Sequence, residues 1–422
     1  MKLKTILNRL QPLKRFIYQE TCMVLDRRGQ WKVDISIRPH RQRAACCSRC
    51  GRPLATYDTL PERIWAFVPI LNVPAFLHYS PRRVNCPEHG VVVEALPWSD
   101  GKRPYSKALM LFLGNWARRL SWKETAMIFK VSWQAVYRSV EWMVEWGLAH
   151  RELANITAIG VDELHVGNGK KSKNYLTLIY QIDAQCRRLL WVGQTRRAAA
   201  LRKGLQSLGK PVLAGIRHIC SDMWRPYLKV IAASLSHGCH MIDRFHVVQT
   251  LNAAVDEVRR RDMAAMTARP AAKQKLKKMR WTLLRRKTRV RGKAREMLDR
   301  ILGTRLQTGR AYLFKESFQH FWSYHSPTWA RNYLQAWVKR ACRSRIAPII
   351  KAAKTIAKHE ELLLNWIRAR NEVFTGATEG LNNKARVVTK RSYGFRTFHG
   401  AEMALYHTLG QLPEPVITHK FW

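Results

Sequence analysis

The stretch AIGVDELHVG (158–167) places two acids, Asp162 and Glu163, inside a run of apolar residues that alternates as a β-strand does. An unpaired buried carboxylate is costly in free energy, so Asp162 requires a cation or a set of hydrogen-bond donors. Side chains alternate along a strand, and we therefore expect Glu163 on the opposite face. A second apolar run, AGIRHICSD, ends in the same way at Asp222.

The elements around these acids have a recognisable order. Three strand-like runs separated by turn residues predict an antiparallel meander over 157–166, 174–183 and 188–195. The following elements are predicted as helix, strand, helix, strand and helix, over 197–208, 214–222, 225–236, 239–243 and from 245 onward. This order matches an RNase H-like domain, whose first and fourth strands are neighbours at the sheet centre. Asp162 and Asp222 then meet, and hard divalent metal ions are the usual way to hold two such carboxylates together.

A third acid lies far downstream, in FTGATEGLNNKARVVTKRSYGFRTFHG (374–400). Glu379 opens a predicted helix, and helical spacing places amides and cations along or near the same face: Asn382, Asn383, Arg386 and Lys390. One helix would thus present a metal ligand followed by phosphate-binding groups. The alternative is a glutamate that stabilises the helix N-terminus by only ~0.3–1 kcal/mol, which leaves the groups behind it unexplained.

Two pairs of residues have the spacing of zinc knuckles. Two residues separate Cys47 from Cys50, and two separate Cys86 from His89, so each short turn can offer two ligands to a tetrahedral zinc ion. Glycine follows each pair, as a tight turn requires. The intervening segment is rich in Val, Leu, Phe and Tyr and fits the strands of a zinc ribbon. Cys46 is an alternative to Cys47 with a less usual spacing, and free thiols in two unrelated turns are the competing interpretation.

The segment LSWKETAMIFKVSWQAVYRSVEWMVEWG (120–147) predicts two helices joined by a tight turn. Ser121 and Glu124 form a capping box for a helix through Phe129, and Ser132 caps a second helix that runs to Gly147. The second helix turns one face inward with Val136, Val140 and Met143, and another outward with Gln134, Tyr137 and Arg138. This pattern fits a helix-turn-helix whose second helix enters the DNA major groove, although helical hairpins are common in other proteins.

Charge and cysteine usage restrict the partners of this chain of 422 residues. Lys and Arg number 75 against 29 Asp and Glu, a net charge of +46 that favours a polyanion, with nucleic acid ahead of an anionic membrane surface. Nowhere do about 20 consecutive apolar residues occur, so no membrane association is expected. The N-terminus lacks the features of a secretory signal. Nine cysteines, an odd number, indicate a reducing cytoplasm.

The separation of Asp222 from Glu379 is too long for a simple loop. Most of it, 251–370, has a helical pattern and a strong basic excess, with 19 Lys or Arg against three acids from Arg259 to Arg310. We interpret it as an insertion that holds DNA against the active site, the alternative being solvated basic faces without a partner. The predicted fold class is multidomain α+β. It comprises a zinc ribbon-like N-terminal domain (1–100), a helix-turn-helix DNA-binding domain (101–152), an RNase H-like α/β catalytic domain (153–250 and 371–422) and the all-α insertion (251–370).

Four motifs along this chain resemble those of one known family: GVDE (160–163), SDMWRPY (221–227), DRFHVVQ (243–249) and TEGLNNKARVVTKRSYGF (378–395). They are similar to the bacterial insertion-sequence transposases of the ISL-three type, which are DDE transposases with an N-terminal zinc-binding region and a helix-turn-helix. The similarity covers nearly the whole chain, although zinc regions of the family commonly use four cysteines and His89 would be the fourth ligand here. The resemblance implies the catalytic triad Asp162, Asp222 and Glu379. It also implies supporting roles for Asp243 and His246, for which a buried core pair is the alternative.

The same resemblance implies a DNA transposase that binds the inverted-repeat ends of its element. Three carboxylates would hold two Mg²⁺ ions ~3.5–4 Å apart, with Mn²⁺ as a substitute, for strand cleavage and strand transfer. Zn²⁺ would be structural. The partners are double-stranded DNA, both transposon ends and target, and a second copy of the chain, because two ends must be brought together. The expected location is the bacterial cytoplasm at the nucleoid. A sequence-specific DNA-binding regulator with an inactive RNase H-like domain is the alternative function, and a structure-specific nuclease is a third.

Overall fold

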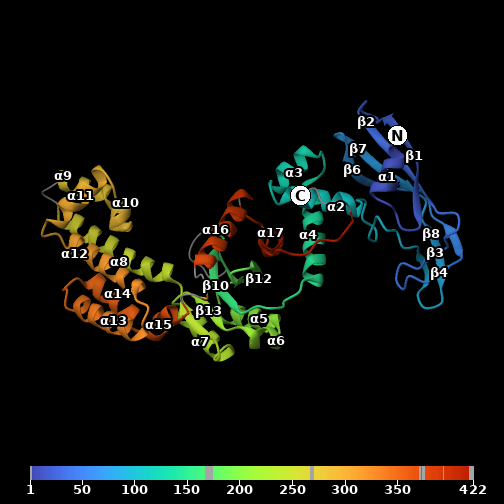
Figure 1. Cartoon of the computed structure of the whole chain (residues 1–422). Coiled ribbons are helices and arrows are strands. Elements are labelled where there is room, and N and C mark those ends of the chain that lie inside the picture. The colour runs from blue at the N-terminus through green and yellow to red at the C-terminus, as the bar shows by residue number, and fades with distance from the viewer. Residues whose placement is uncertain are drawn as a thin grey trace. The chain divides into compact units, whose positions relative to one another are not determined.

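A computed structural model of the chain describes residues 2–166, 174–266, 270–369, 372, 376–392 and 394–417. The chain divides into two compact units (Figure 1). Met1–Glu152 and Arg391–Trp422 form the first unit, and Leu153–Lys390 form the second. Within the described residues, no helix is both long and apolar enough to cross a membrane.

The N-terminal part of the first unit contains a sheet with the strand order β1-β2-β7-β6. Its elements are β1 (Phe16–Leu25), β2 (Trp31–Pro39), β6 (Arg63–Ile70) and β7 (Val73–Tyr79), with helix α1 (Leu3–Leu10) packed against β1. Alternate residues of β2 are buried, as the pleat of a strand requires. The sheet's core is aromatic, and the rings of Phe16, Trp65 and Tyr79 each contact Trp98 edge to face.

Two smaller sheets flank the Cys47–Cys50 and Cys86–His89 pairs. They are formed by β3 (Ala45–Cys46) with β4 (Pro53–Leu54), and by β5 (Thr56–Thr59), β8 (Arg82–Cys86) and β9 (Gly90–Val93). The buried carboxylate of Glu94 accepts hydrogen bonds from the Tyr79 hydroxyl (2.6 Å) and the Arg82 backbone N–H (2.8 Å), and it pairs with the Arg82 guanidinium (2.7 Å). This network joins the end of β7 to the start of β8. The predicted strands between the cysteine pairs are therefore present.

Helices complete the first unit: α2 (Lys107–Ala117), α3 (Trp122–Ile128), α4 (Trp133–His150) and α17 (Phe398–Leu409). The capping box of Ser121 and Glu124 is confirmed, and the Ser132 hydroxyl accepts from the backbone N–H of Ala135 (3.1 Å). The predicted inward residues of α4 are all buried: Val136, Val140 and Met143. Helix α4 continues beyond Gly147 to His150.

The C-terminal segment packs with these helices. Helix α17 contacts α4, and the Arg391 guanidinium donates to the carbonyls of Arg118 (3.0 Å) and Arg119 (2.9 Å) just after α2. Residues 371–422, which the sequence assigns to one domain, are thus divided between the two units at Arg391.

The second unit contains a sheet with the strand order β12-β11-β10-β13-β14. Its strands are β10 (Ala158–His165), β11 (Tyr175–Ile182), β12 (Arg187–Gln194), β13 (His218–Ser221) and β14 (Cys239–Ile242). Strands β10, β11 and β12 form the predicted antiparallel meander, whereas β13 and β14 run parallel to β10. The predicted pairing of the first and fourth strands is confirmed, from Ala158↔His218 to Val161↔Ser221.

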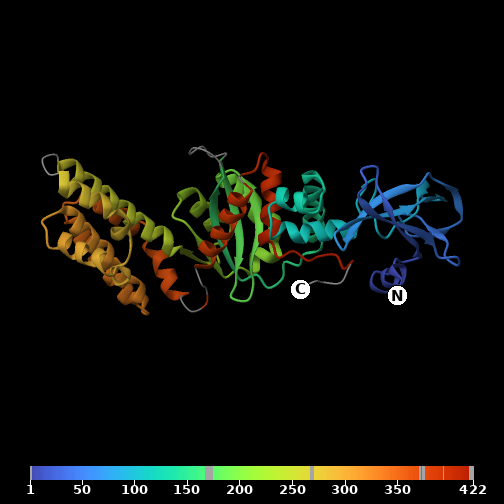
Figure 2. The same ribbon diagram turned by 90° about the horizontal axis from the view of Figure 1, so that it is seen from above.

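Helices cover both faces of this sheet, as the two views in Figures 1 and 2 show. Helices α5 (Ala198–Leu208), α6 (Lys210–Gly215) and α7 (Arg225–Ser234) cover one face, where Ile159 and Val161 join the apolar core. Helix α16 (Gly376–Arg391) lies across the other face. It approaches closely because residue 160 is glycine: a Cβ there would overlap the Thr378 hydroxyl.

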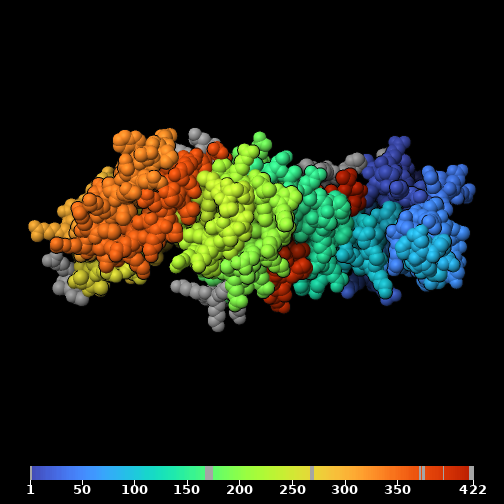
Figure 3. All heavy atoms as spheres, turned by 90° about the horizontal axis from the view of Figure 1, so that it is seen from below, coloured from blue at the N-terminus to red at the C-terminus, as the bar shows by residue number. Residues whose placement is uncertain are grey.

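The elements described between β14 and residue 369 are all helices, as predicted for the insertion. The helices are α8 (Arg244–Ala265), α9 (Pro270–Lys278), α10 (Arg280–Leu284), η2 (Lys287–Arg289), α11 (Lys293–Leu302), α12 (Gln307–Phe318), η3 (Gln319–Ser323), α13 (Pro327–Cys342), α14 (Ala347–Ala357) and α15 (Glu360–Arg368). They share one apolar core, and Figure 3 shows their side chains, yellow to orange, as one packed body. The Asn365 side chain donates to the carbonyl of His240 (2.8 Å), which attaches α15 to the edge strand β14.

Candidate functional site

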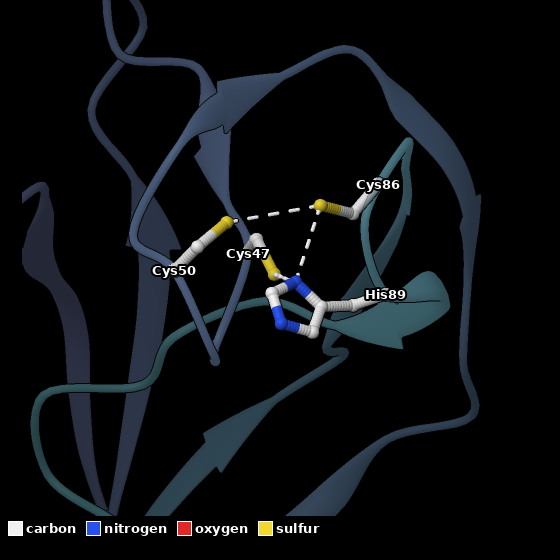
Figure 4. Close-up of side chains that lie close together, drawn as sticks. All are labelled: Cys47, Cys50, Cys86 and His89. Carbon is white, nitrogen blue, oxygen red and sulfur yellow. Dashed lines mark hydrogen bonds between the residues drawn. The ribbon is translucent and has the colours of Figure 1, made fainter.

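The predicted zinc ligands lie together in the first unit (Figure 4). The Sγ atoms of Cys50 and Cys86 are 3.7 Å apart, and His89 Nδ1 lies 3.5 Å from Cys86 Sγ and 3.8 Å from Cys47 Sγ. Bond lengths of ~2.3 Å to sulfur and ~2.1 Å to nitrogen give a tetrahedral zinc ligand–ligand distances of roughly 3.6–3.8 Å. The donor set and its spacing therefore fit a zinc ion.

Local turns create this arrangement. Gly51 and Gly90 follow the two pairs with φ of 73° and 66°, a left-handed conformation that glycine adopts without strain. A hydrogen bond from the Cys50 backbone contributes most to lowering the pKa of Cys47 to about 6, which favours the metal-binding thiolate. Cys46 Sγ instead approaches the Ala44 carbonyl and lies outside the group of four. Of the two alternatives, the geometry therefore favours Cys47.

Asp162 lies within β10, and Asp222 directly follows the neighbouring strand β13. The last parallel pair is Val161↔Ser221, so these acids are the next residues in register. Asp162 is 8% exposed, and its carboxylate accepts hydrogen bonds from the Glu163 N–H (2.7 Å) and the Asn382 side-chain amide. Asp222 Oδ1 accepts from the Trp224 N–H (3.0 Å). The prediction that the two acids lie near each other agrees with this register.

Asp243 and His246, for which only supporting roles were predicted, lie at ligand distance from Asp162. One ligand atom from each of these three residues lies within 4.8 Å of the others, and His246 Nε2 is 3.7 Å from Asp162 Oδ1. Asp243 caps α8 by accepting from the Phe245 N–H (2.9 Å), and its own N–H donates to the Ser221 carbonyl (2.8 Å). The end of β14 and the start of α8 therefore deliver these two side chains to the site.

Glu379 reaches the site through helix α16. One turn further along that helix, Asn382 is buried; it accepts from the Tyr180 hydroxyl (2.8 Å) and donates to Asp162. The half-buried Glu379 is near enough for its charge to raise the pKa of Asp243. Among the described residues, Asp222 and Glu379 stand outside the group of Asp162, Asp243 and His246. Glu379 therefore shares a helix with a residue that contacts Asp162, but the predicted triad is not grouped at ligand distance among the described residues.

Burial and mutual repulsion perturb the charges in this region. Burial raises the pKa of Asp222, and it raises that of Asp243 to about 6. Burial alone would lower the pKa of His246, but its hydrogen bond to Asp162 and the surrounding acids raise it to about 9. Several acids thus compete for few positive charges, and a bound cation would relieve their repulsion.

Sequence reasoning missed two features of the site. The first is the hydrogen bond from Asn382 to Asp162, although helical spacing had placed Asn382 on the same face as Glu379. The second is Arg196, whose Nε lies 3.0 Å from Glu163 Oε2. Glu163 does lie on the face opposite Asp162, as strand alternation predicts, because it joins the side covered by α5 and α7. No periodic signal in the sequence links Arg196 to Glu163.

The predicted DNA-contacting residues are mostly exposed. On α4, Gln134 and Arg138 are exposed, whereas Tyr137 is half-buried, donates to Glu141 (3.0 Å) and contacts the Trp122 ring at 5.3 Å. On α16 the predicted residues Asn383, Arg386 and Lys390 are all exposed. Arg386 donates to Asn383 Oδ1 (2.9 Å), so these two side chains are held together at the surface.

Comparisons with known proteins identify the family of this chain. Residues 159–404 match the family model of ISL-three-type transposases, described as "Transposase". The chain is 27% identical over 391 residues to the transposase for insertion sequence element IS1557 of Mycobacterium tuberculosis, covering 87% of this chain and 86% of that protein. It is 25% identical over 355 residues to the transposase for insertion sequence element IS1001 of Bordetella parapertussis, covering 83% and 85%.

Among solved structures, the Drosophila P element transposase strand transfer complex aligns with a TM-score of 0.39 and 10% identity, over 73% of this chain and 92% of that chain. The family match spans more than half of the chain. The protein is thus a DNA-cleaving and DNA-joining enzyme of the transposase class. It belongs to the bacterial insertion-sequence transposases of the ISL-three type, and its function is DNA transposition.

Proposed function

We propose that this transposase cleaves and joins DNA at the inverted-repeat ends of its element with a metal-dependent DDE site formed by Asp162, Asp222 and Glu379. The observation that supports the proposal is the register of β10 and β13, whose last parallel pair, Val161↔Ser221, comes directly before the two acids, while Asn382 of α16 donates to Asp162. A binding protein has no use for clustered acids that would face DNA phosphates, whereas a metal-dependent nuclease requires them.

The residues fit Mg²⁺, with Mn²⁺ as a substitute, because carboxylate oxygens are the ligands that these hard cations take in proteins. When bound, two such ions would activate the attacking water or 3′ hydroxyl and stabilise the leaving 3′ oxygen. The chain's own residues orient the ligands. Asn382 holds Asp162 from α16, the Trp224 N–H holds Asp222, and His246 supplies a positive charge beside Asp162.

The remaining modules supply DNA binding in this proposal. The sheet of the second unit is an RNase H-like fold, interrupted by the helical insertion. Helices α3 and α4 are a helix-turn-helix that contacts the ends through Gln134 and Arg138, and Cys47, Cys50, Cys86 and His89 hold a structural Zn²⁺. Exposed Asn383, Arg386 and Lys390 contact phosphates near the cleaved bond. At least two copies act together, since two ends must be joined, and the enzyme works on chromosomal DNA in the bacterial cytoplasm.

The test is cleavage of labelled duplexes that carry the repeats flanking the gene, with Mg²⁺ or with Ca²⁺. We expect Asp222→Asn to reduce cleavage on the order of 10³-fold or more while end binding in Ca²⁺ is retained. The matched control is Asp183→Asn at the far end of β11, where the carboxylate only accepts hydrogen bonds from Thr157 and Gln181. Retained Mg²⁺-dependent cleavage by Asp222→Asn would exclude this site.

Asp243→Asn separates two possible ligand sets. If Asp243 only supports the site, this variant keeps measurable cleavage and Asp222→Asn does not. The reverse result would assign the metal to the group of Asp162, Asp243 and His246 instead.

A further inference from the structure

Arg196 lies in an unusual setting between β12 and α5. Its guanidinium is 4.7 Å from the ring centroid of Trp224 and 5.1 Å from that of Tyr175, and its Nε is 3.0 Å from Glu163 Oε2. Three separate segments thus fix the plane of one cation. The side chain nevertheless remains 32% exposed, so the guanidinium is accessible from solvent.

Its partner Glu163 is expensive to bury. The Glu163 side chain is 10% exposed, and its Oε1 atom is buried without a hydrogen-bond partner among the described residues. A buried carboxylate with one unpaired oxygen lowers the stability of the fold, so a functional role of the cation that it orients would explain why the pair is kept.

The pair is also joined to the proposed active site. Trp224, which lies against the Arg196 guanidinium, donates its backbone N–H to Asp222 Oδ1 (3.0 Å). Glu163 follows Asp162 directly on β10 and points to the other face. Arg196 is therefore beside the catalytic carboxylates without competing for their metal ions.

We propose that Arg196 binds a DNA phosphate adjoining the cleaved bond, and that Glu163 is its positioning residue; this rests on the proposed function. A guanidinium presents parallel N–H donors that match phosphate oxygens, and stacking against aromatic rings keeps its plane fixed. The acids of this site repel the DNA backbone. Metal ions offset that repulsion at the reacting phosphate, and Arg196 offsets it at the next one.

The experiment scans single neutral methylphosphonates along duplexes that carry the flanking repeat, with wild type and Arg196→Gln. We expect Arg196→Gln to lower single-turnover cleavage about 10–100-fold, the range for a charged hydrogen bond, and to weaken binding in Ca²⁺. One methylphosphonate position should cause the same losses in wild type and no further loss in the variant. Such non-additivity identifies the two groups as partners.

Matched variants separate contact from folding. Arg197→Gln removes the same charge at the next, exposed residue and should behave as wild type. Arg196→Lys keeps the charge but not the planar donors, and should restore only part of the cleavage. Glu163→Ala should lower single-turnover cleavage and binding in Ca²⁺ less than Arg196→Gln does, and Glu163→Gln, which can still accept from Arg196, should recover part of both losses.

Additive losses at every phosphate, in both binding and cleavage, would overturn the inference and leave Glu163 and Arg196 as a structural ion pair. A structural pair also predicts a lowered thermal midpoint with unchanged kcat in the folded fraction. If wild type cut no duplex, the proposed function would fail. The binding scan in Ca²⁺ would still decide whether Arg196 contacts a phosphate.

Discussion

The two candidate metal sites of this protein are assembled in opposite ways. The ligands of the cysteine–histidine site lie between Cys47 and His89 in two tight turns. The acids of the proposed catalytic site come from within β10, from the end of β13, from the start of α8 and from α16, which follows the whole helical insertion. The first site depends on local turn geometry, and the second depends on packing between distant elements.

This difference identifies where each site is vulnerable. The cysteine–histidine site is expected to be most sensitive at its ligands and turns, while contacts of β3 and β4 with β8 bring its two pairs together. The acidic site can also be disrupted at residues that never touch DNA or metal, such as Gly160 under α16, His240 beside β13 and Tyr180 beneath Asn382. The following changes test this contrast.

The largest effect is expected at the cysteine–histidine site. Cys86→Ser should reduce bound zinc from about one ion per chain to near zero and unfold the surrounding sheets, because structural zinc contributes roughly 10–16 kcal/mol in isolated fingers. Metal analysis and a thermal melt measure both. Cys46→Ser alters the neighbouring buried thiol outside the group and should keep its zinc. Equal zinc loss in both variants would contradict the assigned ligands.

Gly160→Ala tests whether packing assembles the acidic site. The added Cβ would overlap the Thr378 hydroxyl and lie 3.2 Å from Ile182 Cγ2, so α16 must shift. We expect a loss of about 1–3 kcal/mol in stability, together with reduced cleavage because Glu379 moves with the helix.

The adjoining residues supply controls for this change. Thr378→Ala removes the clashing atoms and should restore much of the activity in the double variant. Gly380→Ala, on the same helix with nothing within 4 Å, should be neutral or stabilising. Unimpaired cleavage by Gly160→Ala would show that the acidic site tolerates movement of α16.

A moderate loss of folding stability is expected when the pH is lowered. Burial, with the charge of His359, lowers the pKa of His240 to about 4, and its Nε2 lies 2.8 Å from the Ser221 hydroxyl. In the unfolded chain His240 takes up a proton near pH 6.5, whereas in the folded chain it does so only near pH 4. The contribution of neutral His240 to the free energy of unfolding is therefore fully present above pH 6.5 and is lost as the pH falls toward 4. The loss at pH 5.5 should be on the order of 1 kcal/mol.

His240→Asn should remove this part of the acid sensitivity, measured as the fall in thermal midpoint between pH 7 and 5.5. His237→Asn, at an exposed histidine nearby in the sequence, is the control and should melt as wild type does. If the thermal midpoint of His240→Asn fell as much as that of wild type, His240 would not be the cause of the acid sensitivity.

The smallest effect is expected from Tyr180→Phe. It removes the hydroxyl that donates to Asn382 Oδ1 (2.8 Å), at a cost of about 1 kcal/mol, and should lower cleavage several-fold by loosening Asn382 against Asp162. Asn382→Ala should cost more. Combining the two should cost no more than Asn382→Ala alone, whereas additive losses would mean that Tyr180 acts independently.

The amino-acid sequence by itself determined the local features. The spacing of Cys47, Cys50, Cys86 and His89, the capping box at Ser121 and the strand order that pairs β10 with β13 were all predictable. Turn spacing, capping and hydrophobic alternation are written in neighbouring residues, and a simple topology rule extends them to Asp162 and Asp222. Membership of the transposase family followed from motifs of the same kind.

Only the tertiary structure decided which distant side chains meet. It brought Asp243 and His246 to Asp162, bonded Asn382 to Asp162, set Arg196 against Glu163, and packed the segment after Arg391 with the first unit. These contacts join elements across long stretches of chain, where no periodicity relates one residue to another. Their geometry follows from how closely helices pack on a sheet, down to the missing Cβ of Gly160, and that is a property of the folded chain alone.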